Sequence, residues 1–192
     1  MVASRETSTK KDATYEDILA LPEHVNGELV DGELIVSPRP ASRHGRATTK
    51  LGARLDAFDR EPGADEGPSG WIFIDEPELH FGKNVLIPDL AGWRRERQPD
   101  LADRAWIADA PDWVCEVLSP STQRADRILK LPRYRSAGVA WAWLVQPIDQ
   151  LVEVFRGEGQ SWVLAATGVG DDVIRLPPFE ALELSLADLW RF

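Results

Sequence analysis

Apolar and polar positions along this chain alternate in short runs, and these runs predict both strands and helices. Alternation with a period of two is typical of strands, whereas apolar residues three or four positions apart are typical of helices. Strands are predicted at residues 28–36 (as a hairpin), 71–74, 78–81, 85–93, 112–118, 140–145, 151–155 and 161–165. Helices are predicted at residues 14–21, 42–58, 119–136 and 186–190. The order helix, three strands, helix, strand, with further hairpins outside, indicates an α/β domain around a mixed sheet.

Turn and capping residues place several of these boundaries. Asp31-Gly32 is a two-residue turn signal between apolar arms. The run Ser119-Pro120-Ser121-Thr122 is typical of a helix start, and Gly138 ends the same helix. Pro132 inside this helix removes a hydrogen-bond donor, so we expect a kink there.

Two of the predicted strands each carry one carboxylate among apolar residues. Asp89 lies in Ile87–Trp93, and Glu116 lies in Asp112–Leu118. Side chains alternate along a strand, so Asp89 and Glu116 each share a face with apolar neighbours. An ionised carboxylate in such a place is costly unless a cation or several donors compensate it. Carboxylates on adjacent strands can hold one ion, and oxygen ligands favour Mg²⁺ or Mn²⁺.

A basic helix follows the second of these strands directly. Lys130 lies four residues after Asp126 and four before Tyr134, so the three side chains line one helical face. A divalent ion beside a lysine suits phosphodiester hydrolysis, because the ion activates water and the lysine stabilises phosphate charge. The residues leave a second interpretation open, in which Lys130 and Arg127 only neutralise Asp89 and Glu116 as ion pairs.

Composition and charge narrow the class of protein. The chain has 192 residues, of which 43% are hydrophobic and 28% charged, and this composition is globular. Its length suits one domain, which we expect at residues 13–192 after a disordered tail at 1–12. The sequence has neither a membrane span nor a signal core, and its single cysteine, Cys115, suits a reducing compartment, so we expect a cytoplasmic protein. The formal charge of −10 argues against broad electrostatic capture of nucleic acid, although arginines gather at 94–97 and 124–135.

Three longer strings resemble the Uma family of putative restriction endonucleases, which belongs to the PD-(D/E)XK nuclease superfamily. They are Leu86-Ile87-Pro88-Asp89-Leu90-Ala91-Gly92-Trp93, Ala110-Pro111-Asp112-Trp113-Val114-Cys115-Glu116-Val117-Leu118-Ser119-Pro120, and Lys130-Leu131-Pro132-Arg133-Tyr134. The resemblance runs from about Tyr15 to Trp190. It implies a restriction-endonuclease-like core of helix, three strands, helix and strand around a mixed sheet, with added N-terminal and C-terminal hairpins.

The resemblance also implies roles for particular residues. Asp89 and Glu116 would bind Mg²⁺ or Mn²⁺ with the Val117 carbonyl, and Glu28 is a weaker candidate ligand. The superfamily lysine normally lies two residues after the second acid, where this chain has Leu118, so Lys130 from the next helix is the expected replacement.

Three further residues are expected to bind substrate. They are His44, Arg127 and Tyr134. A structural role at the helix end is an equally open interpretation for His44. The implied function is Mg²⁺-dependent hydrolysis of DNA by a homodimer, with the hairpin at 151–164 as a candidate dimer surface. The alternative is a catalytically degenerate nuclease fold that binds nucleic acid or protein.

Overall fold

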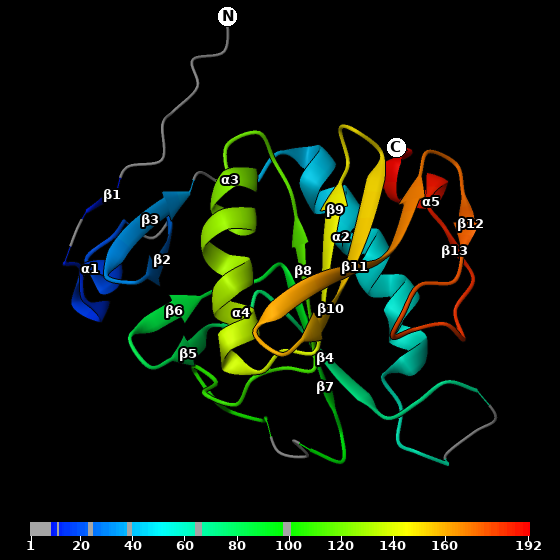
Figure 1. The fold of residues 1–192 in the computed structure, drawn as a ribbon, viewed down its shortest axis with the longest axis horizontal. Helices are drawn as coiled ribbons and strands as arrows, with labels where there is room; N and C mark the ends of the chain where they lie inside the picture. The colour runs from blue at the N-terminus through cyan, green and yellow to red at the C-terminus, as the bar shows by residue number, and fades with distance from the viewer. Residues whose placement is uncertain (1–8, 11, 23–24, 38–39, 64–66, 98–100) are drawn as a thin grey trace, which may run out of the picture.

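The chain folds into two larger β-sheets joined by a short crossing segment, with a separate two-stranded sheet (Figure 1). The structure is a computed structural model, and it describes residues 9–10, 12–22, 25–37, 40–63, 67–97 and 101–192. Of the expected tail at 1–12, Thr9–Lys10 form a strand, β1, and residues 1–8 and 11 lie outside the described residues. That residues 13–192 form one domain stays a prediction.

The larger sheet has six strands, and β8–β9 is its parallel pair, whereas the other neighbours run antiparallel. In spatial order its strands are β11 (Ser161–Val169), β10 (Leu151–Glu158), β9 (Trp141–Gln146), β8 (Trp113–Val117), β7 (Leu90–Arg94) and β4 (Trp71–Asp75). We call it the central sheet. The fold class is therefore α/β with a mixed sheet, as the sequence predicts, and the β10–β11 pair extends this sheet at one edge.

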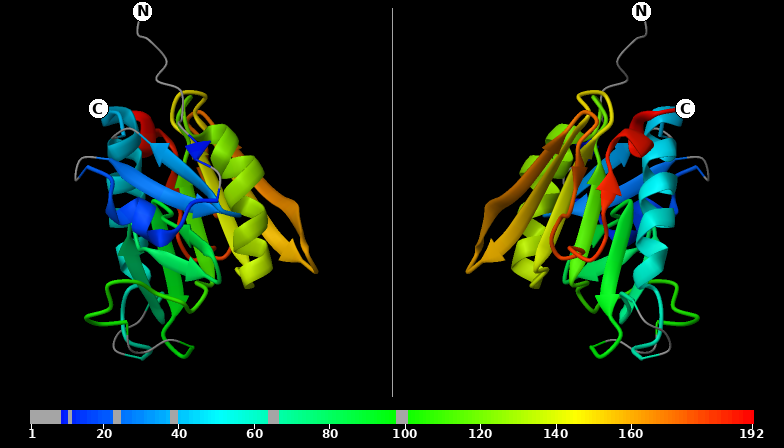
Figure 2. Two further views of the ribbon diagram at one scale, coloured as in Figure 1. Left: turned by 90° about the vertical axis from the view of Figure 1, so that its left-hand side faces the viewer. Right: turned by 90° about the vertical axis from the view of Figure 1, so that its right-hand side faces the viewer.

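Helices cover both faces of the central sheet (Figure 2). On one face α2 (Ser42–Leu55), followed by a 3₁₀ turn at Asp56–Phe58, packs with the C-terminal helix α5 (Ala187–Trp190). The other face carries the basic helix that follows β8. A short pair, β12 (Val173–Ile174) with β13 (Leu184–Ser185), precedes α5.

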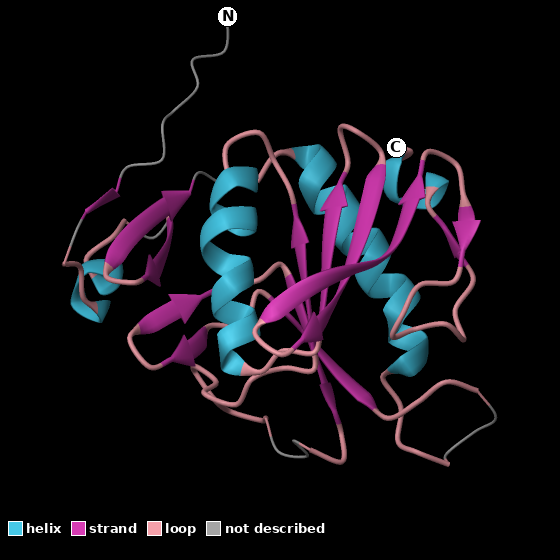
Figure 3. Cartoon of the chain, viewed as in Figure 1, coloured by secondary structure: helices cyan, strands magenta, loops and turns pink. Residues whose placement is uncertain are grey.

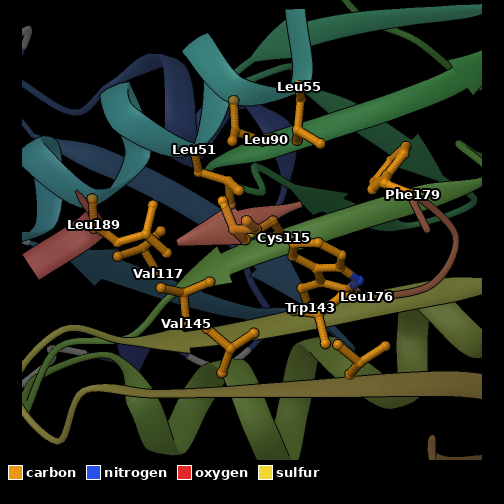
Figure 4. Packing of buried hydrophobic residues seen from close by; sticks show 14 of the residues in the cluster. Leu51, Leu55, Leu90, Cys115, Val117, Trp143, Val145, Leu176, Phe179 and Leu189 are labelled. Carbon is orange, nitrogen blue, oxygen red and sulfur yellow. The ribbon is translucent and has the colours of Figure 1, made fainter. Parts of the chain in front are cut away.

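Alternation along β8 sends its side chains into the two cores, as expected. Cys115 and Val117 pack beneath α2 with Trp143 of β9 (Figure 4). Val114 and Glu116 face the basic helix on the other side. The tryptophans of β8 and β9 pack in the core, with the rings of Trp113 and Trp143 edge to face at 5.6 Å.

The smaller sheet has five strands around the Asp31-Gly32 turn. Its order is β1, β3 (Glu33–Ser37), β2 (Asn26–Val30), β6 (Asn84–Leu86) and β5 (Leu79–Phe81), with α1 (Tyr15–Leu19) beside β2. Asp31 and Gly32 have φ of 54° and 81°, the left-handed values that a tight hairpin turn requires.

The single strand predicted at 85–93 is wrong. Residues 84–86 are β6 of the smaller sheet, and residues 90–94 are β7 of the central sheet. Between them Ile87-Pro88-Asp89 crosses from one sheet to the other. Pro88 has no N–H to donate to a ladder, so the strand breaks there. Asp89 consequently lies at the entrance of β7, outside the strand.

The basic helix is one continuous coil (Figure 3). It consists of α3 (Gln123–Ala125), a π-helical turn (Asp126–Lys130) and α4 (Leu131–Ala137), and Gly138 ends it with φ of 101°. The π-helical turn ends two residues before Pro132. In an α-helix the ring of a proline would clash with the carbonyl of the residue four positions earlier, and the wider turn relieves this clash. Among the residues that the structure describes, none of the helices has the length and apolar character needed to cross a membrane.

Candidate active site

Asp89 and Glu116 are neighbours across two adjacent strands. Leu90 pairs with Cys115 in the antiparallel β7–β8 ladder, so the next residues outward, Asp89 and Glu116, oppose each other. The Asp89 Oδ2 accepts a hydrogen bond of 2.7 Å from the Val117 backbone N–H. The Asp89 side chain is therefore held at the end of β8, and the joint role of the two acidic residues stays a prediction.

Glu116 belongs to a buried group of charges that we call the lysine cluster. Its members are Glu28, Glu116, Asp126, Lys130 and Tyr134. The Lys130 Nζ lies 2.8 Å from Glu28 Oε1 and 2.8 Å from Glu116 Oε1. The Tyr134 hydroxyl donates to the same Glu116 oxygen at 2.6 Å. The side chains of Lys130 and Glu116 are only 3% and 4% exposed, so these contacts form away from solvent.

The π-helical turn explains why two charged residues of one helix face the core. Asp126 and Lys130 begin and end this turn, and both are buried. Asp126 Oδ1 lies 3.7 Å from Lys130 Nζ. The wider turn keeps residues four apart on one side, and wide turns of this kind are frequent at functional sites.

The same cluster holds the segment that joins the two sheets. Glu28 Oε1 accepts from the Ile87 N–H at 2.7 Å, and Lys130 Nζ donates to the Ile87 carbonyl at 3.0 Å. Because Ile87 is two residues before Asp89, these bonds fix the crossing segment that delivers Asp89 to β7. The cluster therefore has a structural role in addition to any chemical one.

Burial and charge shift the pKa values of this cluster in one direction. Burial raises the pKa of Glu116 well above its usual value, and it raises that of Asp126 to about 6. Burial alone lowers the pKa of Lys130, but the carboxylates of Glu116 and Glu28 raise it well above its usual value. Lys130 thus remains an ammonium that donates hydrogen bonds. Three carboxylates around one ammonium leave excess negative charge, which a proton or a second cation would neutralise.

Asp89 faces a different environment, which we call the acidic groove. This groove has a volume of about 400 Å³ and runs between α2 and the strands β4 and β7. It is lined by Pro40, His44, Gly45, Thr48, Thr49, Gly52, Asp75, Glu76, Asp89 and Leu90. His44 Nε2 lies 3.1 Å from Asp89 Oδ1, and these side chains are 13% and 14% exposed.

The groups in the acidic groove also have shifted pKa values. Burial lowers the pKa of His44, but its hydrogen bond to Asp89 and the Asp89 charge raise it above the usual value. Burial raises the pKa of Asp75 and of Glu76, and the neighbouring carboxylates raise both further. The groove therefore carries negative charge that favours cations over bare phosphate.

Arg127 and Tyr134, which are expected to bind substrate, both have partners within the protein, and their role in substrate binding stays a prediction. Arg127 forms an ion pair with Glu153 of β10, which Gln146 also contacts at 2.9 Å. Tyr134 is fully buried, and its hydroxyl is directed at Glu116. The sequence left open that basic residues only neutralise the two acids as ion pairs. Lys130 does form such an ion pair with Glu116. Asp89 pairs with His44 and not with an arginine.

Several other arginines of the clusters at 94–97 and 124–135 are also engaged within the protein. Arg94 lies over the Trp71 ring with 4.2 Å from its Cζ to the centroid, Arg95 pairs with Asp59, and Arg97 pairs with Asp112. On the basic helix, Arg133 pairs with Asp31. Arg135 donates to the Gly159 carbonyl and lies over the Trp162 ring. These contacts reduce the positive surface available for a phosphate backbone.

The donor chemistry of the site fits a hard divalent cation, although the side chains are not arranged around one. Four carboxylates, from Glu28, Asp89, Glu116 and Asp126, influence one another electrostatically around the single buried ammonium. Oxygen donors with excess negative charge are what Mg²⁺ and Mn²⁺ prefer. Within the described ranges, however, no three side chains of His, Cys, Asp or Glu are grouped as ligands. Glu116 faces Lys130 and Asp89 faces His44, so the shared hollow that the sequence suggests is divided in two.

Sequence reasoning did not assign two residues of these regions to the site. Asp126 was placed on the helical face of Lys130 without a role, and its spacing of four residues was the available signal. Asp75 ends β4 beside Glu76, whose φ of 46° is unusual for a residue with a side chain. A carboxylate at the end of a strand is a weak signal, because such positions are usually solvated.

Comparisons with known proteins agree with the fold. A solved structure, a putative nuclease belonging to DUF820 from Anabaena variabilis ATCC 29413, superposes with a TM-score of 0.70 and 24% sequence identity, over 92% of this chain and 97% of that chain. This similarity supports the nuclease-type fold that the sequence predicts. No curated protein matches the chain. The sequence profile of the Uma2 family, described as putative restriction endonuclease, matches residues 13–187. This protein belongs to the Uma2 family, and that membership supports a nuclease-like function.

Proposed function

We propose that this protein is an endonuclease that hydrolyses phosphodiester bonds in DNA with the help of Mg²⁺ or Mn²⁺. One observation carries the proposal. Asp89 and Glu116 oppose each other at the ends of adjacent strands, and the ammonium of Lys130 lies 2.8 Å from Glu116. Two acids and a lysine at a sheet edge, in a chain of this family, supply the groups that phosphodiester hydrolysis needs.

Asp89 and Glu116 are the residues that would hold the cation, together with the Val117 carbonyl. A bound divalent cation activates a water molecule and offsets the charge that builds on the phosphate oxygens. Asp89 is already oriented by the Val117 N–H at 2.7 Å. Glu28 is bonded to Lys130, so it is better placed to support the ligands of the cation than to bind the cation directly.

Lys130 acts in this proposal as a hydrogen-bond donor. Its raised pKa keeps it protonated at neutral pH, so it stabilises negative charge and orients water without removing a proton. Its side chain is 3% exposed. Glu116 must therefore turn away from it before Lys130 can contact a phosphate or a water molecule in the site.

The acidic groove is the surface through which substrate would approach Asp89. His44 lines the groove, but its Nε2 contacts Asp89 and its Nδ1 is buried, so His44 must leave Asp89 before it can donate a hydrogen bond to a phosphate oxygen. Apart from His44, the residues of α2 that line the groove are small, among them Gly45 and Gly52, which leaves space for a sugar-phosphate backbone. The opposite wall carries Asp75, Glu76 and Asp89. Because these carboxylates repel a phosphate, a cation is needed between them and the substrate.

A second candidate function is binding of nucleic acid or protein without cleavage. The specific observation that favours it is the buried Lys130–Glu116 pair, which neutralises a catalytic acid within the protein. The engaged arginines and the net charge of −10 point the same way. In that case the protein keeps the nuclease fold and its acidic residues but does not cleave nucleic acid.

Calorimetric titration with Mn²⁺ separates these functions. The wild type is expected to bind Mn²⁺ with micromolar to millimolar affinity, and Asp89→Asn is expected to lose this binding. Asp31→Asn is the matched control, because it removes one negative charge from a turn that touches neither region. Absence of heat in the wild type would eliminate the cation-dependent nuclease.

Cleavage of supercoiled DNA then distinguishes an enzyme from a binder. We expect nicking that requires Mg²⁺ or Mn²⁺ and disappears in Lys130→Gln, with circular dichroism to check that the variant is folded. Equal nicking by both proteins would remove Lys130 from the mechanism. A parallel reaction with RNA tests whether DNA is the substrate.

We also propose a homodimer in which β10 and β11 contribute the contact surface. β11 is an edge strand without charged residues, and Val163, Leu164 and Val169 are exposed on it. Such edges tend to pair with another chain. Sedimentation equilibrium measures the assembly state, and a monomer at micromolar concentration would contradict this part. The cytoplasmic location stays an expectation.

A further inference from the structure

The ammonium of Lys130 already has three hydrogen-bond acceptors. Its Nζ lies 2.8 Å from Glu28 Oε1, 2.8 Å from Glu116 Oε1 and 3.0 Å from the Ile87 carbonyl oxygen. An ammonium has three protons to donate, so these contacts use all of them. Asp126 Oδ1, at 3.7 Å, is too far away for a fourth hydrogen bond.

Asp126 is therefore a buried carboxylate close to Lys130 but not bonded to it. Its side chain is 6% exposed, and its surroundings include the Thr122 hydroxyl as a hydrogen-bond partner. Burying a carboxylate is costly unless its charge is compensated. In the present arrangement Asp126 receives the electrostatic attraction of Lys130 but no hydrogen bond from it.

We propose that Asp126 is a positioning residue that takes over the Lys130 ammonium when Glu116 turns to a divalent cation beside Asp89. This inference depends on the proposed function. Glu116 uses a single oxygen, Oε1, to accept from both Lys130 and Tyr134. When Glu116 turns toward a cation, the buried ammonium loses one of its three acceptors.

Asp126 is in the right place to replace the lost acceptor. Shortening its contact from 3.7 Å to the 2.8 Å of the other pairs requires a shift of 0.9 Å. Glu28 and the Ile87 carbonyl can keep their bonds, because they lie on other elements than Glu116. The π-helical turn carries both Asp126 and Lys130, so the exchange takes place within one turn of one helix.

A double-mutant cycle with Mn²⁺ affinity as the readout tests the inference. Asp126→Asn is expected to weaken Mn²⁺ binding by about tenfold, as is typical for residues that support metal ligands. Because Asp126 acts through Lys130, the same change in a Lys130→Gln background is expected to alter the affinity by less than about twofold. Asp31→Asn, with the same loss of charge, is expected to leave the affinity unchanged.

The outcomes separate this inference from the proposed function. Absence of Mn²⁺ binding by the wild type would overturn both. Wild-type binding with no effect of Asp126→Asn would overturn only the exchange. An equal loss in both backgrounds would also overturn it, because Asp126 would then act on the cation through its own charge.

A second measurement does not depend on the folding of the Lys130 variant. In wild-type crystals soaked with Mn²⁺, we expect Lys130 Nζ within hydrogen-bond distance of Asp126 Oδ1 and no longer bonded to Glu116. A contact that stays at 3.7 Å while Mn²⁺ is bound to Glu116 would contradict the exchange.

Discussion

The lysine cluster and the acidic groove lie on either side of the same two strand ends, and they differ in the burial of their charges and in how those charges are paired. In the lysine cluster the charges are buried and bonded to one another. In the acidic groove the carboxylates of Asp75, Glu76 and Asp89 line an open space of about 400 Å³. Asp89 belongs to the groove and Glu116 to the cluster, although each is next to a residue of the last pair in the β7–β8 ladder, Leu90 with Cys115.

This difference shows how one site can combine stability with access. The cluster joins the two sheets through Ile87, so its charges hold the fold together. The groove makes few such contacts, so its residues are available to bind a cation or a substrate. We therefore expect substitutions in the cluster to reduce both stability and activity, and substitutions in the groove to reduce activity alone.

Replacement of Lys130 by Met is expected to have the largest effect on stability. It leaves Glu28, Glu116 and Asp126 without their cation in a buried place, and breaking a buried pair in this way typically costs about 3–5 kcal/mol. Urea denaturation measures the free energy of unfolding. Arg133→Met is the control on the same helix, because its ion pair with Asp31 is exposed and contributes about 1 kcal/mol or less. Equal losses in the two variants would show that the cluster does not stabilise the fold.

Replacement of Tyr134 by Phe is expected to cost about 1.5–3 kcal/mol of unfolding free energy, because it removes a buried hydrogen bond to a charged group. Tyr15→Phe provides a matched control. The Tyr15 hydroxyl donates to Glu78 in a more exposed place, so we expect a smaller loss there. If the Tyr15 variant loses more stability than the Tyr134 variant, the assignment of Tyr134 to the cluster fails.

The pH dependence of stability gives a smaller effect with a defined sign. The pKa of Asp126 is raised to about 6, so between about pH 4 and pH 6 the folded protein holds a proton that the unfolded chain has released. The contribution of Asp126 to stability is therefore greatest below about pH 4, and it decreases as the pH rises to about 6. Asp126→Asn is expected to flatten this part of the profile of unfolding free energy against pH. Identical slopes for the variant and the wild type would contradict the burial of a titrating Asp126.

Replacement of His44 by Gln is expected to change the unfolding free energy least, by about 1 kcal/mol or less, because its contact with Asp89 lies at the groove surface. The same change should reduce DNA cleavage by at least about tenfold. His80→Gln is the control, since His80 also pairs with a carboxylate, Glu78, at 2.6 Å but lies outside the groove. Equal cleavage by both variants would show that His44 has only a structural role.

Much of the fold could be predicted because the local sequence signals are strong. The alternation along Trp113–Val117 correctly separates the residues of the two cores. The Asp31-Gly32 turn and the Gly138 helix end depend on backbone conformations that glycine adopts readily, and both are where the sequence places them. The two acids were identified because a carboxylate inside an apolar run is unusual.

Other features could not be predicted because they depend on contacts between distant segments. The strand expected at 85–93 breaks at Pro88, but its division between two sheets depends on the bonds that Glu28 and Lys130 make to Ile87 at the crossing. Arg127 was expected near substrate, but the partner that determines its position is Glu153, 26 residues away in β10. The acidic groove combines α2 with β4 and β7, and no local pattern indicates that these elements meet there.

The sequence by itself determined most of the strands and helices, the faces of β8 and the identity of the acidic residues with Lys130, because periodicity, turn residues and isolated charges are local properties. Only the tertiary structure decided how those charges are shared. Lys130 contacts three carboxylates from three segments, whereas Asp89 faces His44 across a groove. The physical reason is that the position of a buried charge is set by its partners, and these partners come from segments that only folding brings together.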